Sequence, residues 1–383
     1  MTVSALGAGP RAGVIAALSE IDWTLCLALC AIAGAGVAML YSIDGSAWTP
    51  WAARHLAVFA AGLILMLLLA MADLRVWFAV AYPTYGLGLL LLGVVAVAGH
   101  SSLGARRWLE LGPLGVQPSE IVKIGLVLAL ARFYHSLSVQ KARLSWSLLV
   151  PAALIAVPAA MVARQPDLGT ALLILATGGA IMVMAGLSLR VAGAGLVAVG
   201  AALPLAFNFV LKPYQRARLL TFLDPEADRA GAGYHIIQSK IALGSGGLLG
   251  KGFGLGTQSQ LNFLPEKQTD FIFASLAEEF GFVGCVSILL LYAAVIVMAL
   301  RIASTAHSHF ARLAAAGVTV TFALCVLING AMVMGLAPVV GVPMPLLSYG
   351  GTVMITMMVG FGLVLSVRAH RYGEVTSGKG ALI

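Results

Sequence analysis

The sequence predicts an all-α polytopic membrane protein with about ten transmembrane helices and a long outer loop between the seventh and the eighth. Of the 383 residues, 60% are apolar and only 10% are charged, whereas soluble domains carry about 25% charged residues. Apolar runs of about 20 residues, the length that crosses a bilayer, recur along the chain. No tandem repeat or soluble accessory domain is recognisable, so we expect one membrane domain.

Ten apolar segments are expected to span the membrane. They cover about 22–42, 54–72, 76–98, 117–135, 147–163, 168–187, 191–211, 270–300, 313–335 and 351–368. The segment 270–300 is longer than a bilayer requires, so it should tilt or protrude. The chain then divides into an N-terminal segment (1–21), a ten-helix membrane domain (22–372, with the long outer loop at about 212–269) and a tail (373–383).

The net charge of +8 reflects membrane orientation rather than nucleic-acid binding, because the basic residues lie mostly between the spans. With the N-terminus inside, eleven fall on the inner side: Arg11, Arg75, Arg132, Lys141, Arg143, Arg190, Arg301, Arg312, Arg368, Arg371 and Lys379. Four fall in the short outer loops: Arg54, Arg106, Arg107 and Arg164. The long loop adds seven more, but its 58 residues lie at the limit of this rule. We therefore expect both termini in the cytoplasm.

The cysteines and histidines do not indicate a metal site or a disulfide framework. All four cysteines, Cys26, Cys30, Cys285 and Cys325, lie inside apolar runs, which is typical of buried structural thiols. The seven histidines are scattered without an HExxH or comparable spacing, so no metal site is predicted. The first apolar run, Trp23 to Ser42, is long enough to span, which disfavours a cleavable signal peptide.

The first outer region, 99–116, leads into the fourth expected helix through GARRWLELGPLGVQPSEIVK. Glu120 falls in the first turn of that helix and Lys123 on the same face. They are either a helix cap and a snorkelling lysine, or a charge pair that lines a polar cavity open to the outside. Arg106, Arg107 and Trp108 suit phosphate binding through forked donors, or an interfacial basic cluster with an aromatic anchor.

Two features occupy the long loop. The string GYHIIQSKIALG predicts an amphipathic helix along the membrane surface, with Ile236, Ile237, Ile241 and Leu243 as its apolar set. Seven of the thirteen residues from Gly244 to Gly256 are glycine. This stretch fits either backbone N–H groups that approach an anion such as a pyrophosphate, or a re-entrant turn packed against helices.

The long loop ends in the polar hinge LPEKQTD, which contains Lys267 and Gln268 and leads into the eighth helix. We expect Thr269 to cap that helix and Asp270 to lie in its first turn. A carboxylate at a membrane boundary beside apolar surface should have a raised proton affinity, which suits a general base. A simple capping role is the alternative.

Three other carboxylates can be explained by structural roles. Asp167, in ARQPDLGT, is at a turn between two spans, where Pro-Asp-x-Gly is ordinary turn chemistry; Arg164 beside it could still face the outer cavity. Glu278 and Glu279 lie two turns into the eighth helix, where both could be buried and either could pair with a Lys or Arg of another helix.

Prolines and a glycine pair interrupt the helix pattern at membrane depth in MGLAPVVGVPMPLLSYGGTVM. Non-helical backbone is tolerated there only where it is buried in protein or lines a cavity. We expect this segment, with Ser348 and Tyr349, to form a third wall of the same outer cavity.

The strings RRWLELG…QPSEIVK, LPEKQTDFIFASLAEEFG and GLAPVVGVPMPLLSYGG resemble the SEDS family (shape, elongation, division and sporulation) in order and spacing. The resemblance runs from about Asp22 to Tyr372, and FLPEKQTDFIF and GLAPVVGVPMP look like the RodA branch rather than the FtsW branch. The family's essential aspartate matches Asp270, its paired glutamate and lysine match Glu120 and Lys123, and its Arg-Trp motif matches Arg107 and Trp108.

The resemblance implies a ten-helix (SEDS-fold) peptidoglycan glycosyltransferase of the bacterial inner membrane, with its active site on the extracytoplasmic face. Such an enzyme polymerises lipid II and releases undecaprenyl pyrophosphate. The implied partners are a class B penicillin-binding protein transpeptidase, other proteins of the elongation (rod) complex, lipid II and membrane lipids, with no nucleic acid.

Our mechanistic hypothesis makes Asp270 the general base of an inverting glycosyl transfer. Arg106, Arg107, Lys123 or Lys267 would stabilise charge on the leaving pyrophosphate. The sequence indicates no certain cofactor, and a divalent cation (Mg or Mn) is left open as a further source of positive charge. Two other functions remain as alternatives: a lipid II flippase, because ten helices with intramembrane charges and broken segments also describe a transporter, and a non-catalytic scaffold of the elongation machinery.

Overall fold

The computed structural model describes residues 20–102, 105–111, 114–137, 148–209, 213–228 and 231–371. Each of the ten expected spans forms a helix with ends within a few residues of the prediction. These helices are α2 (Trp23–Ile43), α3 (Trp51–Ala70), α4 (Leu74–Ala98), α5 (Pro118–His135), α6 (Leu149–Arg164), α7 (Leu168–Met184), α8 (Leu189–Phe209), α12 (Ile272–Thr305), α13 (His309–Val333) and α14 (Gly351–Ala369). The chain is thus an all-α polytopic membrane protein.

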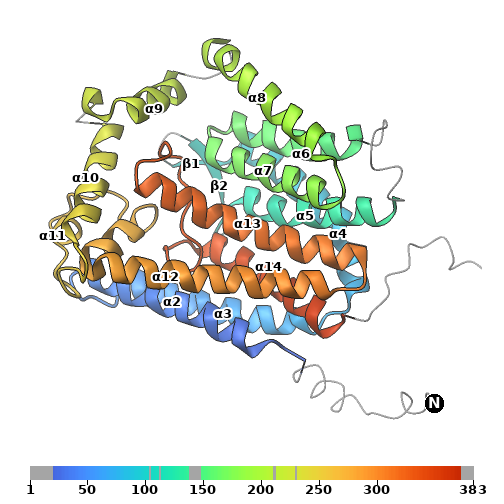
Figure 1. The fold of residues 1–383 in the computed structure, drawn as a ribbon, viewed down its shortest axis with the longest axis horizontal. Coiled ribbons are helices and arrows are strands. Elements are labelled where there is room, and N and C mark those ends of the chain that lie inside the picture. The colour runs from blue at the N-terminus through green and yellow to red at the C-terminus, as the bar shows by residue number, and fades with distance from the viewer. Residues whose placement is uncertain are drawn as a thin grey trace, which may run out of the picture.

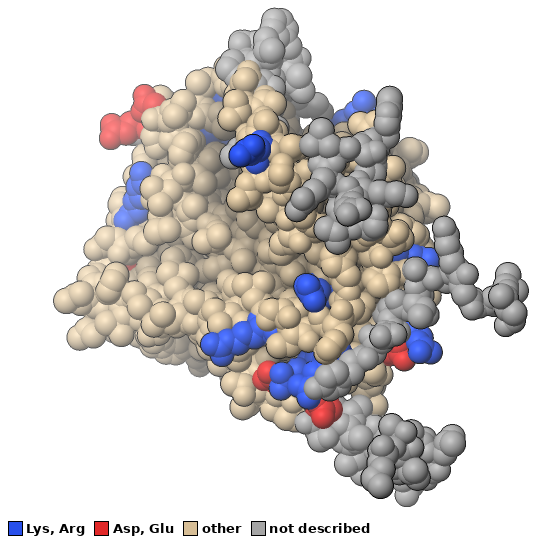
Figure 2. Space-filling view, turned by 45° about the vertical axis from the view of Figure 1, so that its right-hand side comes forward, with Lys and Arg blue, Asp and Glu red and all other residues tan. Residues whose placement is uncertain are grey.

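Most of these helices run side by side along the length of the molecule (Figure 1). By length and composition, six helices of the described chain can cross a membrane, namely α2, α3, α4, α12, α13 and α14, and α6 and α7 are shorter apolar helices. Figure 2 shows that much of one face is uncharged, with Lys and Arg in small groups. A face of this kind suits contact with lipid.

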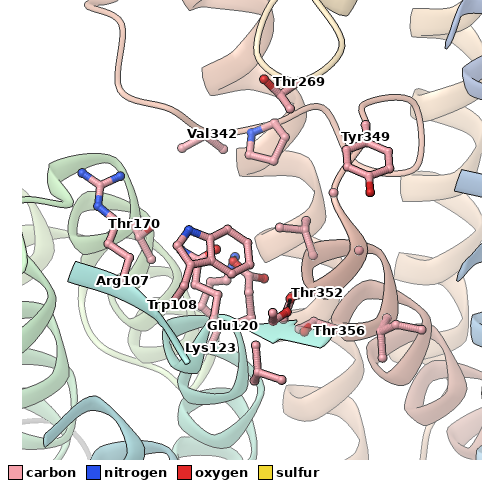
Figure 3. A pocket seen from close by; sticks show the side chains of 18 of the residues that line it. Arg107, Trp108, Glu120, Lys123, Thr170, Thr269, Val342, Tyr349, Thr352 and Thr356 are labelled. Carbon is pink, nitrogen blue, oxygen red and sulfur yellow. Dashed lines mark hydrogen bonds and ion pairs between the residues drawn. The ribbon is translucent and has the colours of Figure 1, made fainter. Parts of the chain in front are cut away.

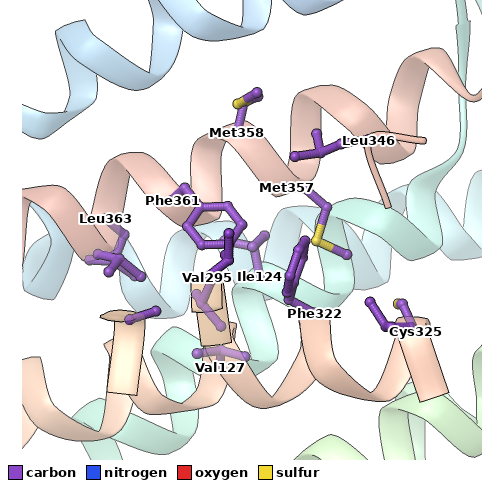
Figure 4. Packing of buried hydrophobic residues seen from close by; sticks show 14 of the residues in the cluster. Ile124, Val127, Val295, Phe322, Cys325, Leu346, Met357, Met358, Phe361 and Leu363 are labelled. Atoms are coloured by element: carbon purple, nitrogen blue, oxygen red, sulfur yellow. The ribbon is translucent and has the colours of Figure 1, made fainter. Parts of the chain in front are cut away.

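Helix α5 lies in the interior of the bundle and is buried on nearly every side. It crosses α4 closely at Gly125, where an added Cβ would lie 2.8 Å from the Cα atom of Tyr85. Residues of α5, α13 and α14, among them Ile124, Phe322 and Phe361, pack together in the core (Figure 4). The rings of Phe322 and Phe361 meet edge to face, with their centroids 5.0 Å apart, a favoured arrangement for aromatic pairs.

The first described helix begins, and the last one ends, at the end of the bundle opposite α9, α10 and α11 (Figure 1). An even number of crossing helices produces this arrangement. The backbone N–H of His307, between α12 and α13, donates to Arg371 O at 3.3 Å and ties the chain's last described residue to that end. We call the opposite end, where the three expected outer regions meet, the cavity end.

The region 99–116 forms a small antiparallel sheet, which the sequence analysis did not predict. Its strands are β1 (His100–Ser102), β2 (Ala105–Leu111) and β3 (Leu114–Val116), in the order β1-β2-β3. The alternation of polar and apolar residues in ARRWLEL is the strand signal, but it covers only these few residues. The sheet fixes the positions of Arg107 and Trp108 at the cavity end.

The long loop is largely helical, with α9 (Pro213–Leu223), a 3₁₀ turn η2 (Pro225–Asp228), α10 (Ala232–Ser245) and α11 (Thr257–Gln260). Helix α10 crosses the end of the bundle (Figure 1) and packs against α12 and α13. Within the expected apolar set, Ile236 is buried, whereas Ile241 is 44% exposed. The face toward the bundle includes the buried Ser239, whose hydroxyl donates to Val333 O at 2.7 Å.

Candidate active site

A cavity of about 1270 Å³ opens at the cavity end of the bundle. Side chains from α3, β2, α5, α7, α14, the turn before α12 and the segment before α14 line it (Figure 3). The lining includes seven of the predicted site residues: Arg107, Trp108, Glu120, Lys123, Thr269, Asp270 and Tyr349. The three outer regions that the sequence singled out therefore form walls of one cavity.

Glu120 and Lys123 form an ion pair at the wall of this cavity. The Nζ atom of Lys123 lies 2.7 Å from Oε1 of Glu120, and the two residues are only 4% and 2% exposed. The paired interpretation of these charges is therefore correct. The second carboxylate oxygen, Oε2, is buried and has no hydrogen-bond partner among the described residues. A buried carboxylate oxygen without a donor is costly, and a ligand hydroxyl or amide could satisfy it.

Arg107 extends from β2 and is braced against the turn between α6 and α7. Its guanidinium donates to the carbonyl oxygens of Pro166 and of Gln165, the latter at 3.4 Å, and lies 3.9 Å from Oδ1 of Asp167. Asp167 also accepts a hydrogen bond from Thr170 N at 3.2 Å at the start of α7. Its predicted role at a turn is therefore confirmed, and it lines the cavity as well.

Two neighbouring arginines differ from Arg107. Arg106 lies in β2 beside it, but its side chain is outside the described residues. Arg164, which could have faced the cavity, is exposed and does not contribute to the lining. Trp108 does contribute, and its ring packs near Gly115 of β3, where an added Cβ would be 3.3 Å from Trp108 Cε3.

Asp270 lies in the turn before α12 rather than in the first turn of that helix. The expected Thr269 cap is wrong, because α12 begins at Ile272 without a side-chain cap and the Thr269 hydroxyl donates to Glu266. Glu266 adopts a positive φ of 50° and accepts backbone bonds from Thr269 and Phe271, which closes a tight turn ahead of the helix. This turn places the Asp270 carboxylate in the cavity wall.

The surroundings of Asp270 favour its protonated form. Burial raises the pKa of its carboxyl to about 6, and the nearby charge of Glu266 adds to the increase, whereas Arg218 and Arg107 oppose it. Gly341 lies against the carboxylate, since an added Cβ there would be 3.7 Å from Oδ2. A carboxylate with this proton affinity can accept a proton near neutral pH.

Three predicted site residues do not line the cavity. The ammonium of Lys267 donates to Ile43 O at 2.8 Å, Ser259 O at 2.7 Å and Asn262 Oδ1 at 2.8 Å, so it anchors the hinge to α2 and α11. Gln268 contributes its backbone oxygen to Tyr349 N at 2.8 Å. Ser348 is buried, and its hydroxyl accepts from Met344 N at 2.9 Å. These contacts shape the walls rather than the interior of the cavity.

Sequence reasoning missed several polar residues that line the cavity. Thr352 and Thr356, one turn apart on α14, face it together (Figure 3). Arg54 and Glu266 also line it, although Arg54 had been counted only for orientation. The i, i+4 spacing of two threonines on one face of an apolar helix is a signal that could have identified the α14 pair.

The glycine-rich stretch lies away from the cavity, and none of the residues from Gly244 to Gly256 lines it. Of its two interpretations, packing against helices is correct. Glu278 and Glu279 are both buried. Glu278 pairs with Lys251 of this stretch at 2.6 Å, whereas Glu279 accepts from the hydroxyl of Ser42 in α2 at 2.6 Å and from Gly254 N of this stretch at 3.2 Å, so neither pairs with a Lys or Arg of another helix. Within the described chain, no group of three or more His, Cys, Asp or Glu side chains is arranged to hold a metal ion.

Comparison with known proteins connects this cavity to a family. A model described as a cell cycle protein, covering FtsW, RodA and SpoVE, matches residues 18–373. The peptidoglycan glycosyltransferase MrdB of Escherichia coli K12 is 44% identical over 92% of this chain and 94% of its own length. MrdB of Helicobacter pylori 26695 is 36% identical over 82% of each chain.

Two solved structures have the same fold. RodA of Thermus thermophilus matches with a TM-score of 0.70 and 31% identity over 92% of this chain and 98% of its own. A chain from a peptidoglycan synthase complex, studied for the coordination of polymerization and crosslinking, matches with a TM-score of 0.80 and 36% identity, over 92% and 99%. The chain therefore belongs to the FtsW/RodA/SpoVE family, as its SEDS motifs predicted.

Proposed function

We propose that this protein is a peptidoglycan glycosyltransferase that polymerises lipid II into β-1,4 glycan strands during cell elongation. The observation that carries the proposal is a single cavity in which a carboxylate of raised pKa, Asp270, shares the walls with the Glu120–Lys123 pair and with Arg107. The names of its relatives supply the reaction class, since MrdB of E. coli and of H. pylori are peptidoglycan glycosyltransferases.

In the proposed reaction the donor is a glycan chain whose reducing end carries an α-linked lipid pyrophosphate, and the acceptor is lipid II. Asp270 takes the proton from the 4-hydroxyl of the acceptor's N-acetylglucosamine. That oxygen attacks the anomeric carbon of the donor, and the bond from this carbon to the pyrophosphate oxygen breaks. Inversion gives the β-1,4 bond and releases undecaprenyl pyrophosphate with both bonding electrons.

Positive side chains would stabilise the charge that develops on the leaving pyrophosphate. Arg107 and Lys123 remain candidates because both line the cavity, and fixed donors in a water-poor site act strongly on such charge. Lys267 becomes less suitable, since its ammonium is held by three oxygen acceptors of the hinge. The cavity also holds both substrates together, which supplies part of the rate by proximity.

A divalent cation is compatible with this arrangement. Mg²⁺ is usually held by one or two carboxylates together with substrate phosphates, and Asp270, Glu266 and Asp167 are the carboxylates beside Glu120 in the lining. A cation bound there with the pyrophosphate would neutralise charge on the leaving group. Loss of polymerisation in EDTA, restored by Mg²⁺ or Mn²⁺, would support this part of the proposal.

We also propose that the cavity faces the outside of the cytoplasmic membrane, with both termini in the cytoplasm, and that a class B penicillin-binding protein cross-links the product. Support for this partner comes from the structural neighbour, which is a chain of a peptidoglycan synthase complex. Charge supports the orientation, because the inner connections carry more Lys and Arg than the short outer loops.

A lipid II flippase is the competing function. Transporters usually place their sites near the bilayer midplane between broken helices. Here the polar lining lies at one end of the bundle, since Arg54, Glu120 and Thr352 are in the first turns of α3, α5 and α14. This location favours an enzyme. A scaffold without catalysis would need no carboxylate of raised pKa in a cavity.

The test is glycan polymerisation by the purified chain with labelled lipid II and a cognate transpeptidase whose own active site is blocked. Wild type should produce polymer and Asp270→Asn should produce none. Asp224→Asn, which changes an exposed carboxylate of the long loop outside the cavity, is the matched control and should behave as wild type. Polymer from Asp270→Asn at the wild-type rate would refute the role of Asp270. Lipid II crossing liposomes without polymer from any variant would identify a flippase.

A further inference from the structure

Helix α12 is interrupted at Gly281, which adopts φ 63° and ψ −159°. In an unbroken helix, the N–H groups of Phe282 and Val283 would donate to the carbonyls of Glu278 and Glu279. Instead they donate to Gly247 O at 2.9 Å and Leu248 O at 3.1 Å. The carbonyls of Glu278 and Glu279 accept from the N–H groups of Lys251 and Gly252, each at 3.0 Å. The glycine-rich segment 247–255 thus satisfies these four backbone groups of α12.

Glycine is required for this close approach. An added Cβ at Gly250 would lie 2.1 Å from Glu279 O, and one at Gly281 would lie 2.4 Å from Gly250 N. Side chains fix the segment further, because Glu278 binds Lys251 at 2.6 Å and Glu279 accepts from Gly254 N at 3.2 Å. The segment is therefore held rigidly against α12.

The depth of this segment follows from the sequence of α12. No charged residue lies between Glu279 and Arg301. At 1.5 Å per residue the intervening helix, 280–300, is about 30 Å long, which equals the hydrocarbon thickness of a bilayer. A hydrocarbon layer that ends before Arg301 would therefore begin near Phe280, at the level where α12 binds Gly247 and Leu248.

Apart from Lys251, the large side chains of the segment are apolar and exposed. Leu248 is 72% exposed, Leu249 78% and Leu255 63%. Phe282 of α12, beside them, is 62% exposed. In water such a patch would be unfavourable. The single cation within it, Lys251, is neutralised by Glu278.

We propose that residues 247–255 form a re-entrant wedge that inserts into the acyl chains of the leaflet at the cavity end. Non-helical backbone can enter hydrocarbon only when its polar groups are satisfied inside the protein, and the four bonds to α12 provide this for the segment's inner edge. The wedge fixes the height of α12 in the bilayer, and with it the height of Asp270, which lies two residues before that helix.

Lipid is the occupant that the surroundings favour, because the leucines continue the exposed apolar surface of α12. Phe282 and Val283 lie directly beside the wedge, and Leu290 two turns further is 65% exposed. These residues belong to a helix long and apolar enough to span the membrane. The wedge extends that lipid-facing surface around the start of its hydrocarbon portion.

The test locates residue 249 in liposomes by spin-label accessibility to oxygen, which concentrates in acyl chains, and to a water-soluble nickel chelate. The four native cysteines are replaced by alanine, and single labels are placed at Leu249, at Leu290 as the lipid reference and at Asp224 as the exposed loop reference. The label at 249 should resemble that at 290, with oxygen collisions several-fold above nickel collisions. Nickel accessibility equal to that at 224 would overturn the proposal.

Two further measurements cover failures of this design. If the cysteine-free chain does not fold, Leu249→Trp in the native background replaces it, and lipids with brominated acyl chains should quench the fluorescence it adds to that of wild type; no added quenching would overturn insertion. In the second measurement, the spin labels of the folded cysteine-free chain are measured again with the transpeptidase bound. Unchanged oxygen accessibility at 249 supports lipid as the occupant, whereas its loss would assign the patch to the partner protein. Neither result depends on whether the chain polymerises glycan.

Discussion

The side-chain nitrogen of Asn329 lies 2.9 Å from the main-chain oxygen of Asp270, and it also lies 2.9 Å from Val342 O. Asn329 is a fully buried residue of α13. Both of its donor hydrogens are used, one on the turn that presents Asp270 and one on the segment whose Gly341 faces the carboxylate, where an added Cβ would be 3.7 Å from Oδ2. One side chain thus fixes the distance between two walls of the cavity.

Replacing this clamp should reduce catalysis more than it reduces folding. Asn329→Leu keeps the branched shape and the number of side-chain heavy atoms but leaves two buried carbonyls without donors, which costs about 1–3 kcal/mol for each. We expect turnover per folded molecule to fall at least tenfold, with a smaller change in KM. The matched control is Thr319→Val, which removes a buried hydroxyl from the same helix. Equal turnover in the two variants would show that the Asn329 contact only supports folding.

The pH dependence of polymerisation should follow the ionisation of Asp270. A general base must be deprotonated, and the pKa of this carboxyl is raised to about 6. Activity should therefore be constant above about pH 7 and fall roughly tenfold per pH unit below the pKa. Initial rates measured between pH 4.5 and 8 would reveal this, with folding monitored at each pH. A rate that stays level down to pH 5 would exclude Asp270 as the titrating base.

Asp270→Asn should stabilise the protein while it abolishes activity. The folded pKa, about 6, exceeds the usual value of 3.8, so the folded state binds the proton more tightly than the unfolded state. The contribution of this carboxyl to wild-type stability is therefore greatest below pH 4 and is lost as the pH rises through 4 to 6. The shift corresponds to at most roughly 3 kcal/mol, and partial exposure reduces it. The asparagine variant should melt higher than wild type at pH 7.5 but not at pH 4, and an equal difference at both values would contradict this explanation.

The Glu120–Lys123 pair predicts an asymmetric response to mutation. Glu120→Ala leaves a buried ammonium without its partner, which typically costs 3–5 kcal/mol. Replacing both residues by methionine removes both charges and should restore much of that loss. Neither variant should polymerise glycan if the pair supports the site. Thermal unfolding in detergent measures the stability of both variants. A double variant less stable than Glu120→Ala would contradict the explanation that the unpaired ammonium causes the loss.

The sequence predicted the helices well because a helix that crosses a bilayer needs about 20 consecutive apolar residues, and such runs are visible in the sequence. It also brought Arg107, Glu120 and Asp270 to one cavity, since their loops were all assigned to one side of the membrane. Contacts between segments far apart in the chain could not be predicted from the sequence. Nothing local in the sequence shows that Asn329 binds Asp270, that Lys267 points to Ile43 rather than to the cavity, or that Arg107 is braced by Pro166. In each case several polar groups could have served as the partner, and the tertiary packing determines which of them is within reach.

The glycine-rich segment permits a final prediction, in which two glycines of the same stretch should respond differently to alanine. Gly250 has φ +81° and no room for a Cβ, whereas Gly244 is in α10 with nothing within 4 Å of its Cβ position. Gly250→Ala should therefore destabilise the protein by roughly 2–4 kcal/mol, from backbone strain and the clash with Glu279 O. Gly244→Ala should be neutral or stabilising, because alanine favours helix. Thermal unfolding of both variants measures the difference. Equal melting temperatures would mean that the segment is not held against α12 at Gly281, and the anchoring of the wedge would then be refuted.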